Sequence, residues 1–71
     1  MKVTVKVKFG ATKERLENFG LNKYLLYLAH EEDGESTNII AAYLSRNLGV
    51  PPSKIKFAGL DPHKNMVFEV L

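Results

Sequence analysis

Lysines that alternate with apolar residues are the side chains of this chain that most clearly could bind a ligand. Five of them lie in two alternating segments: Lys2, Lys6, Lys8, Lys54 and Lys56. Alternate side chains of a strand point to opposite faces, so these lysines should share the solvent face of a sheet. Tyr24 or Tyr27, depending on the register of a third segment, would add an aromatic ring. Lysines neutralise phosphates and rings stack on bases, so we predict a face that binds single-stranded nucleic acid.

The same face supports a second hypothesis from another functional class. The segment 23–29 is apolar on both faces, so it would also expose apolar side chains, as a protein-interaction surface or a homodimer interface does. Two simpler interpretations stay open. In the first, the lysines serve only to keep the sheet soluble and to protect its edges from aggregation. In the second, residues 11–22 fold over the face and cover it.

Two loop clusters contain groups that act as ligands or catalysts in other proteins. The first is acidic and consists of His30, Glu31, Glu32, Asp33 and Glu35. It lacks the spacing of a calcium loop, and its charge suits the start of a helix. The second, His63 with Asp61 and Lys64, has no serine in a nucleophile-elbow context beside it. We therefore predict no catalytic residue, no metal site and no cofactor. An enzyme would require His63 and the acidic loop to meet in one cleft.

The elements that position these residues follow from periodicity. Residues 2–9 alternate strictly and predict a strand, and residues 23–29 suit a central strand. Two further alternating segments, 54–58 and 66–70, predict a hairpin. Residues 12–18 fit either a helical turn or an extended arm. Ile40, Leu44 and Leu48 lie on one face of a helix that Ser36 or Thr37 would cap and Gly49 would end.

The expected fold is α+β, with two layers and the order β-β-α-β-β. A right-handed crossover that skips one strand gives a mostly antiparallel four-stranded sheet of order 1-2-4-3, with the helix on one face. This order places the apolar segment 23–29 inside the sheet and the first strand at an edge, and the polar face of the first strand disfavours a central position. A β-grasp order, with the first strand in the centre, is the competing arrangement.

Composition limits the class of protein. The 71 residues predict a single domain, 1–71, and the absence of cysteine excludes disulfides, thiolate metal sites and cysteine nucleophiles. A net charge of +2 is mildly basic. No apolar segment is long enough for a membrane span or a signal peptide, so we expect a cytoplasmic protein with no membrane partner, either a monomer or a weak homodimer.

Several short motifs resemble the YggU-like family of small proteins. Residues 7–13 are similar to its "VKPGASK" pattern, Asp33-Gly34 followed by Asn38 to its "DGKAN" helix entry, and residues 48–51 to its "LGVP" helix exit. Phe9 stands where the pattern has proline, and the chain ends on a strand where the family has a helix. The resemblance implies an α+β fold with a mostly antiparallel sheet covered by helix on one face. It implies no activity.

A weaker resemblance is to ubiquitin-like β-grasp proteins, through residues 49–52 and 57–59. The chain ends on Leu71 without the two terminal glycines that conjugation or sulfur-carrier chemistry requires. This resemblance therefore implies a related fold without the carrier function.

Overall fold

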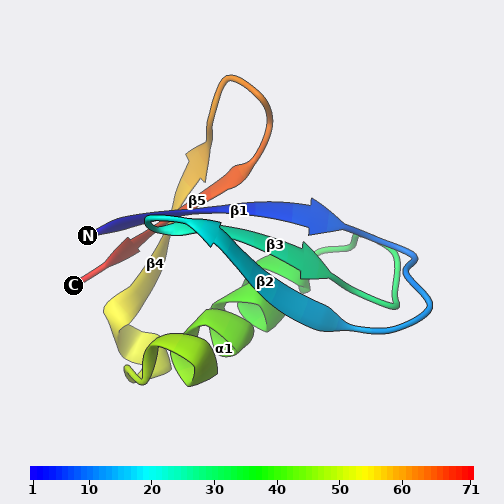
Figure 1. The fold of residues 1–71 in the computed structure, drawn as a ribbon. Coiled ribbons are helices and arrows are strands. Elements are labelled where there is room, and N and C mark those ends of the chain that lie inside the picture. Colours follow the sequence, from blue (N-terminus) through cyan, green and yellow to red (C-terminus); the bar gives the residue numbers. More distant parts are fainter.

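The computed structural model describes residues 1–71, which form one mixed β-sheet with one α-helix packed against it (Figure 1). The elements in chain order are β1 (Lys2–Lys8), β2 (Arg15–Gly20), β3 (Lys23–Tyr27), α1 (Ser36–Leu48), the short 3₁₀ helix η1 (Pro52–Lys54), β4 (Ile55–Leu60) and β5 (Met66–Val70). The predicted α+β class, with two layers and a single helix on one face of the sheet, is confirmed. Helix α1 has neither the length nor the apolarity of a membrane span.

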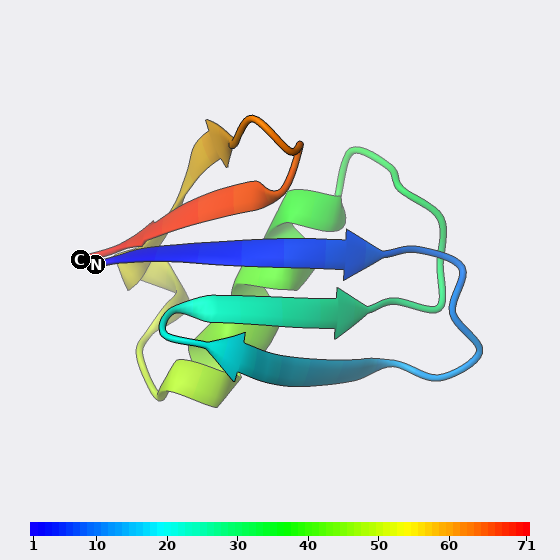
Figure 2. The same cartoon turned by 45° about the horizontal axis from the view of Figure 1, so that its top comes forward.

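The sheet has five strands in the order β2-β3-β1-β5-β4, so the predicted four-stranded order 1-2-4-3 is wrong (Figure 2). The predicted hairpin of the last two strands is present as β4 and β5, and the first strand does neighbour segment 23–29. The error lies in the position of β1, which is central, between β3 and β5. Its pairing with β3 is parallel and the other three pairings are antiparallel.

The lysine-rich face of β1 is compatible with a central position because the sheet is covered on one face only. Val3 and Val5 point to the helix and are fully buried. Lys2, Lys6 and Lys8 point to the opposite face, which no helix covers (Figure 2), and all three side chains are exposed. Solvation of these side chains therefore does not depend on an edge position, so the polar face of β1 does not disfavour a central position.

Strand β2 decides the parallel pairing of β1 with β3. The sequence of residues 12–18 fits either a helical turn or an extended arm, and in the structure Arg15–Gly20 is a strand. It forms a hairpin with β3 through the two-residue turn Leu21-Asn22, with Asn22 in the left-handed region at φ 57°. Because β2 pairs with one edge of β3, β1 pairs with the other edge. β3 runs antiparallel to β2 and therefore parallel to β1.

Helix α1 begins differently from the prediction and ends as predicted. Glu35 occupies the N-cap position without a side-chain cap, while Ser36 is already helical, and its hydroxyl accepts a hydrogen bond from the Asp33 N–H at 2.9 Å. Gly49 adopts the left-handed conformation, at φ 72°, and its N–H bonds to the Ser45 carbonyl. Glycine adopts this conformation without the steric penalty of a Cβ atom, which explains the helix end.

The core lies between the sheet and α1 and is entirely apolar in its centre. The side chains with no solvent exposure are Val3, Val5, Leu26, Leu28, Ile40, Leu44 and Phe68. Three strands and the helix contribute to this set, so the strands cannot be reordered without exposing part of it.

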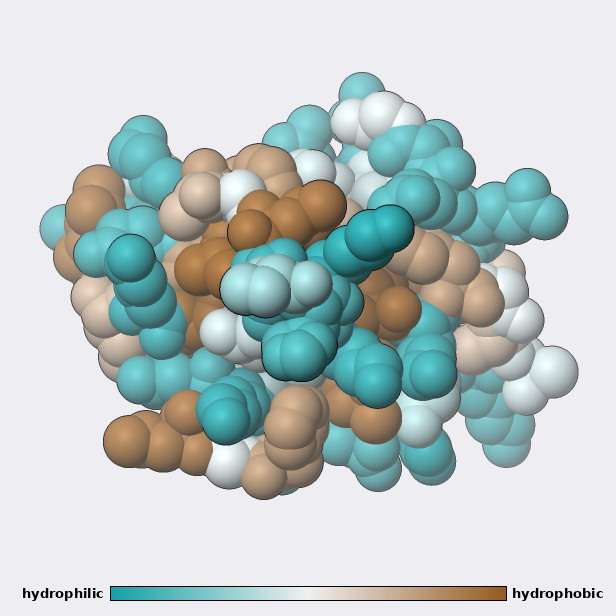
Figure 3. Space-filling model, turned by 90° about the horizontal axis from the view of Figure 1, so that it is seen from above, coloured by the Kyte–Doolittle hydropathy of each residue, from teal (hydrophilic) through white to brown (hydrophobic).

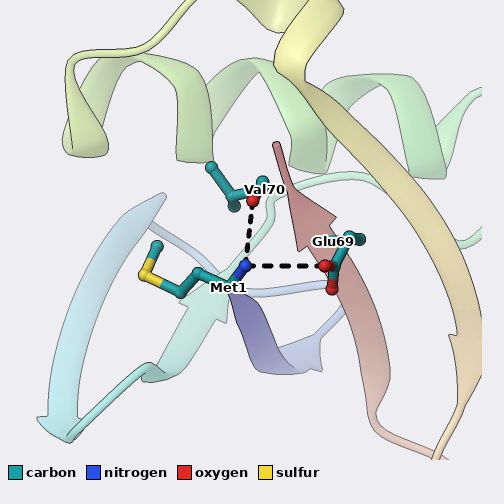
Figure 4. A network of polar contacts seen from close by, with 3 residues as sticks. All are labelled: Met1, Glu69 and Val70. Carbon is teal, nitrogen blue, oxygen red and sulfur yellow. Dashed lines mark hydrogen bonds and ion pairs between the residues drawn. The ribbon is translucent and has the colours of Figure 1, made fainter.

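The two chain ends lie side by side at one end of the sheet (Figures 1 and 2). The Met1 ammonium group donates to the Val70 carbonyl at 3.0 Å and lies 3.5 Å from Glu69 Oε1 (Figure 4). The Val70 N–H bonds back to the Met1 carbonyl at 2.7 Å. These contacts extend the β1–β5 pairing to the end of the chain.

Candidate functional site

The sheet face that turns away from α1 is called the open face here (Figure 3). The strand register determines its members, because paired residues of neighbouring strands share a face. Lys8, Tyr27 and Arg15 form one row across β1, β3 and β2, and Lys6, Leu25 and Glu17 form the next. Lys23 pairs with Thr4 on this face. At the other end, Glu69 of β5 lies between Lys2 and Lys56.

Positive charge is concentrated on the open face. Six of the ten basic side chains lie on it: Lys2, Lys6, Lys8, Arg15, Lys23 and Lys56. Only two of the eight acidic side chains, Glu17 and Glu69, share it. The rest of the molecule is therefore net negative, although the whole chain carries +2. In Figure 3 polar side chains project over and around apolar areas of this face.

Tyr27 is the aromatic residue of the open face, and it has a basic partner. The Arg15 guanidinium carbon lies 4.5 Å from the centre of the Tyr27 ring, a cation–π distance. A hollow of about 460 Å³ adjoins this pair, with Lys13 and Glu14 also in its wall. Both a guanidinium plane and a tyrosine ring can stack on a nucleobase, and the hollow has the volume for one.

Five of the seven predicted site residues lie on the open face, and two do not. Lys2, Lys6, Lys8, Lys56 and Tyr27 share the open face. Tyr24 does not, because the register of β3 turns it toward the core, where it is 8% exposed. Lys54 precedes β4, in η1, and so is not on the sheet.

Sequence reasoning missed two basic residues of the open face, Arg15 and Lys23. The order Arg15-Leu16-Glu17 does alternate, and Leu16 packs against the core. Three residues with a single apolar position are too short a pattern to distinguish a strand from a helical turn. Of the alternatives for the open face, a cover formed by residues 11–22 does not occur, since much of this segment forms edge strand β2.

The acidic loop and the β4–β5 loop approach the same cavity. No three histidine, aspartate or glutamate side chains lie close enough together to hold one metal ion. However, Glu32 and His63 both line a cavity of about 400 Å³ beside β1, together with Lys6 and Lys64. Because the two loops are far apart in sequence, their meeting is a property of the fold alone.

Asp61 organises the loop that carries His63. Its Oδ1 accepts hydrogen bonds from the backbone N–H groups of His63 and Asn65, each at 2.9 Å, and its Oδ2 accepts from the Asn65 amide at 3.3 Å. The bond from the Asn65 N–H is the main reason that the pKa of Asp61 is lowered. Asp61 therefore acts as a turn-forming residue, with both oxygens already engaged.

Comparison with protein-family models, curated proteins and solved structures finds no match for this chain. The YggU-like and ubiquitin-like resemblances therefore stay predictions from the sequence motifs, and the functional argument depends on the geometry of the surface.

Proposed function

We propose that this chain is a non-catalytic binding domain that holds single-stranded nucleic acid on its open face. The concentration of six basic and only two acidic side chains on the face that carries Tyr27 is the observation that supports the proposal. Lysines spread along three strands can neutralise successive phosphates of one strand, while bases stack near the Arg15–Tyr27 pair. Single-strand binding requires an open, cationic and partly aromatic surface of this kind.

The test is an amide NMR titration of the labelled protein with a short single-stranded RNA of mixed sequence. We expect shifts along residues 2–8, 15–17, 23–27 and 56, which weaken as salt rises. Lys6→Glu combined with Lys56→Glu should abolish this binding, because it reverses two charges on separate strands. Arg46→Glu is the matched control, since Arg46 lies on α1, in the other layer. Unchanged binding in the double variant would exclude the open face as the binding surface.

The alternative function is a protein-interaction module, and the charge of the open face decides which partner suits it. Leu25 and Val67 are half-buried there and give the face an apolar component. Two copies stacked through this face would bring like charges together, which opposes homodimerisation. An acidic protein is the partner that fits. If the RNA titration gave no shifts at low salt, capture of acidic protein partners would become the primary experiment.

A further inference from the structure

The sheet divides at the C-terminal end of β1. The pairing of β1 with β5 ends at Val5 and Met66, whereas its pairing with β3 continues to Lys8 and Tyr27. Beyond Met66 the β4–β5 hairpin turns away from β1 (Figure 1). The space between them is the cavity of about 400 Å³ described above, called the fork pocket here, with residues 5–7, 9, 32, 60 and 63–66 in its wall.

The division leaves backbone groups without a strand partner. In β1 the Lys8 carbonyl bonds to Leu28 N–H on the β3 side, so by alternation the N–H and C=O of Val7 point to the other side. That side is the fork pocket, and no hydrogen bond joins Val7 to the hairpin loop. A bound molecule can therefore pair with one donor and one acceptor at a fixed position, in addition to side chains.

The wall of the fork pocket has two chemical halves. Five of its ten residues are apolar: Val5, Val7, Phe9, Leu60 and Met66. Val5 and Met66 are buried, so Val7, Phe9 and Leu60 supply the apolar surface that a ligand can reach. Lys6, His63 and Lys64 also line the pocket and supply basic nitrogen atoms, with Glu32 as the one carboxylate. Basic groups beside an apolar wall suit a ligand that has a phosphate at one end and a flat organic body at the other.

The loop that carries two of these basic groups is held in shape. Lys64 adopts the left-handed conformation at φ 64°, which is uncommon for a residue other than glycine, asparagine or aspartate. The hydrogen bonds of Asp61 to residues 63 and 65 stabilise this turn. The backbone at His63 and Lys64 is therefore ordered before a ligand binds, which lowers the entropy lost on binding.

We propose that the fork pocket binds a phosphate monoester of nucleotide size, with the phosphate at Lys6, His63 and Lys64 and the base against the apolar wall. The ligand is either a free nucleoside monophosphate or the phosphorylated end of a nucleic-acid strand. This inference does not depend on strand binding across the open face. Lys6 belongs to both surfaces, but His63 and Lys64 lie in the β4–β5 loop and not on a strand of the open face, so variants at these two positions test the pocket.

The experiment is an amide NMR titration of the full chain with AMP and CMP, with adenosine and inorganic phosphate as partial ligands. We expect saturable shifts at residues 7 and 63–65 with the nucleotides, and affinity at least about threefold weaker for either partial ligand. Lys64→Asn should weaken nucleotide binding by about threefold to tenfold, because it removes one charged contact. Asparagine adopts the left-handed conformation readily, so the loop should keep its shape. His63→Gln is a second variant with the same expected direction.

Lys54→Asn is the matched control, because it removes the same charge from η1, away from the pocket. Equal weakening by Lys54→Asn and Lys64→Asn, or no saturable shift with any nucleotide, would overturn the proposal. Two tetranucleotides that differ only in a 5′ phosphate distinguish the sources. Tighter binding of the phosphorylated strand than of both AMP and the unphosphorylated strand, measured by the shifts of residues 7 and 63–65, supports a strand end, and tighter binding of AMP supports a free nucleotide. Equal shifts of the pocket residues by both strands would show that a terminal phosphate is not recognised, against the proposal.

Discussion

At the residue scale, Glu14 joins three segments that are separate in the sequence. Its carboxylate accepts hydrogen bonds from the Tyr43 hydroxyl on α1 and from the Ala29 N–H, which follows β3 and lies 3.1 Å away. Glu14 itself immediately precedes β2. The Tyr43 bond is the main reason that the pKa of Glu14 is lowered, and the same bond raises the pKa of Tyr43. Glu14 thus ties the edge strand to the helix layer.

We expect Glu14→Gln to be less stable than the wild type at neutral pH, and the difference to disappear in acid. The folded pKa of Glu14 lies below its ordinary value of 4.5, so its contribution is complete above that value. The contribution is lost as pH falls through the folded pKa, because the unfolded chain then binds the proton more readily. Urea denaturation at neutral pH and at a pH below 4.5 gives the free energy of unfolding of both proteins and so measures both effects. Glu31→Gln is the control. A difference that persists in acid would contradict this role.

At the element scale, α1 is held to the sheet by one short apolar stripe. Ile40 and Leu44 are fully buried against the strands, and Leu48 and Val50 pack at the end of the same stripe. The helix has 13 residues, which is marginal for a helix alone in water, so its formation depends on this contact.

Leu44→Ala should reduce the free energy of unfolding by about 2–5 kcal/mol, because it leaves a cavity in a fully buried position. Leu60→Ala is the matched control, since Leu60 is 59% exposed, and it should change stability by no more than about 0.5 kcal/mol. Urea denaturation followed by circular dichroism measures both. Similar effects of the two substitutions would show that α1 is not packed as described.

At the scale of the whole molecule, the fold converts a small net charge into a strongly divided one. The open face is basic, while the acidic loop of residues 31–35 precedes α1 in the other layer. A polyanion such as the proposed nucleic acid would approach from the side of the open face. The net charge of +2 gives little indication of it.

We expect nucleic-acid binding to weaken steeply with salt, with a slope of log K against log salt of about −0.7 for each phosphate neutralised on a single strand. Lys6→Glu should make the slope shallower by about 0.7 or more, because at least one contact is lost. Fluorescence anisotropy with a labelled single-stranded RNA at several salt concentrations measures it. An unchanged slope would mean that Lys6 does not contact phosphate.

Local patterns were sufficient for the parts of this protein that depend on neighbouring residues. The alternation around Val3 and Val5 predicts a strand with a basic face, and the spacing of Ile40 and Leu44 predicts the helix. Gly49 marks the helix end because a left-handed residue is needed there. In each case the relevant contact lies within one turn or one strand, so the sequence by itself determines it.

Only the tertiary structure decided which strands pair and which groups meet. Backbone hydrogen bonds carry no residue identity, so the central position of β1 and the strand character of residues 15–20 depended on the whole sheet. The same pairing turned Tyr27 to the open face and Tyr24 to the core, which the two-sided apolar segment left open. The fork pocket exists because β5 ends its pairing at Val5, and this places His63 and Glu32 in the wall of one cavity, across a separation that no local pattern spans.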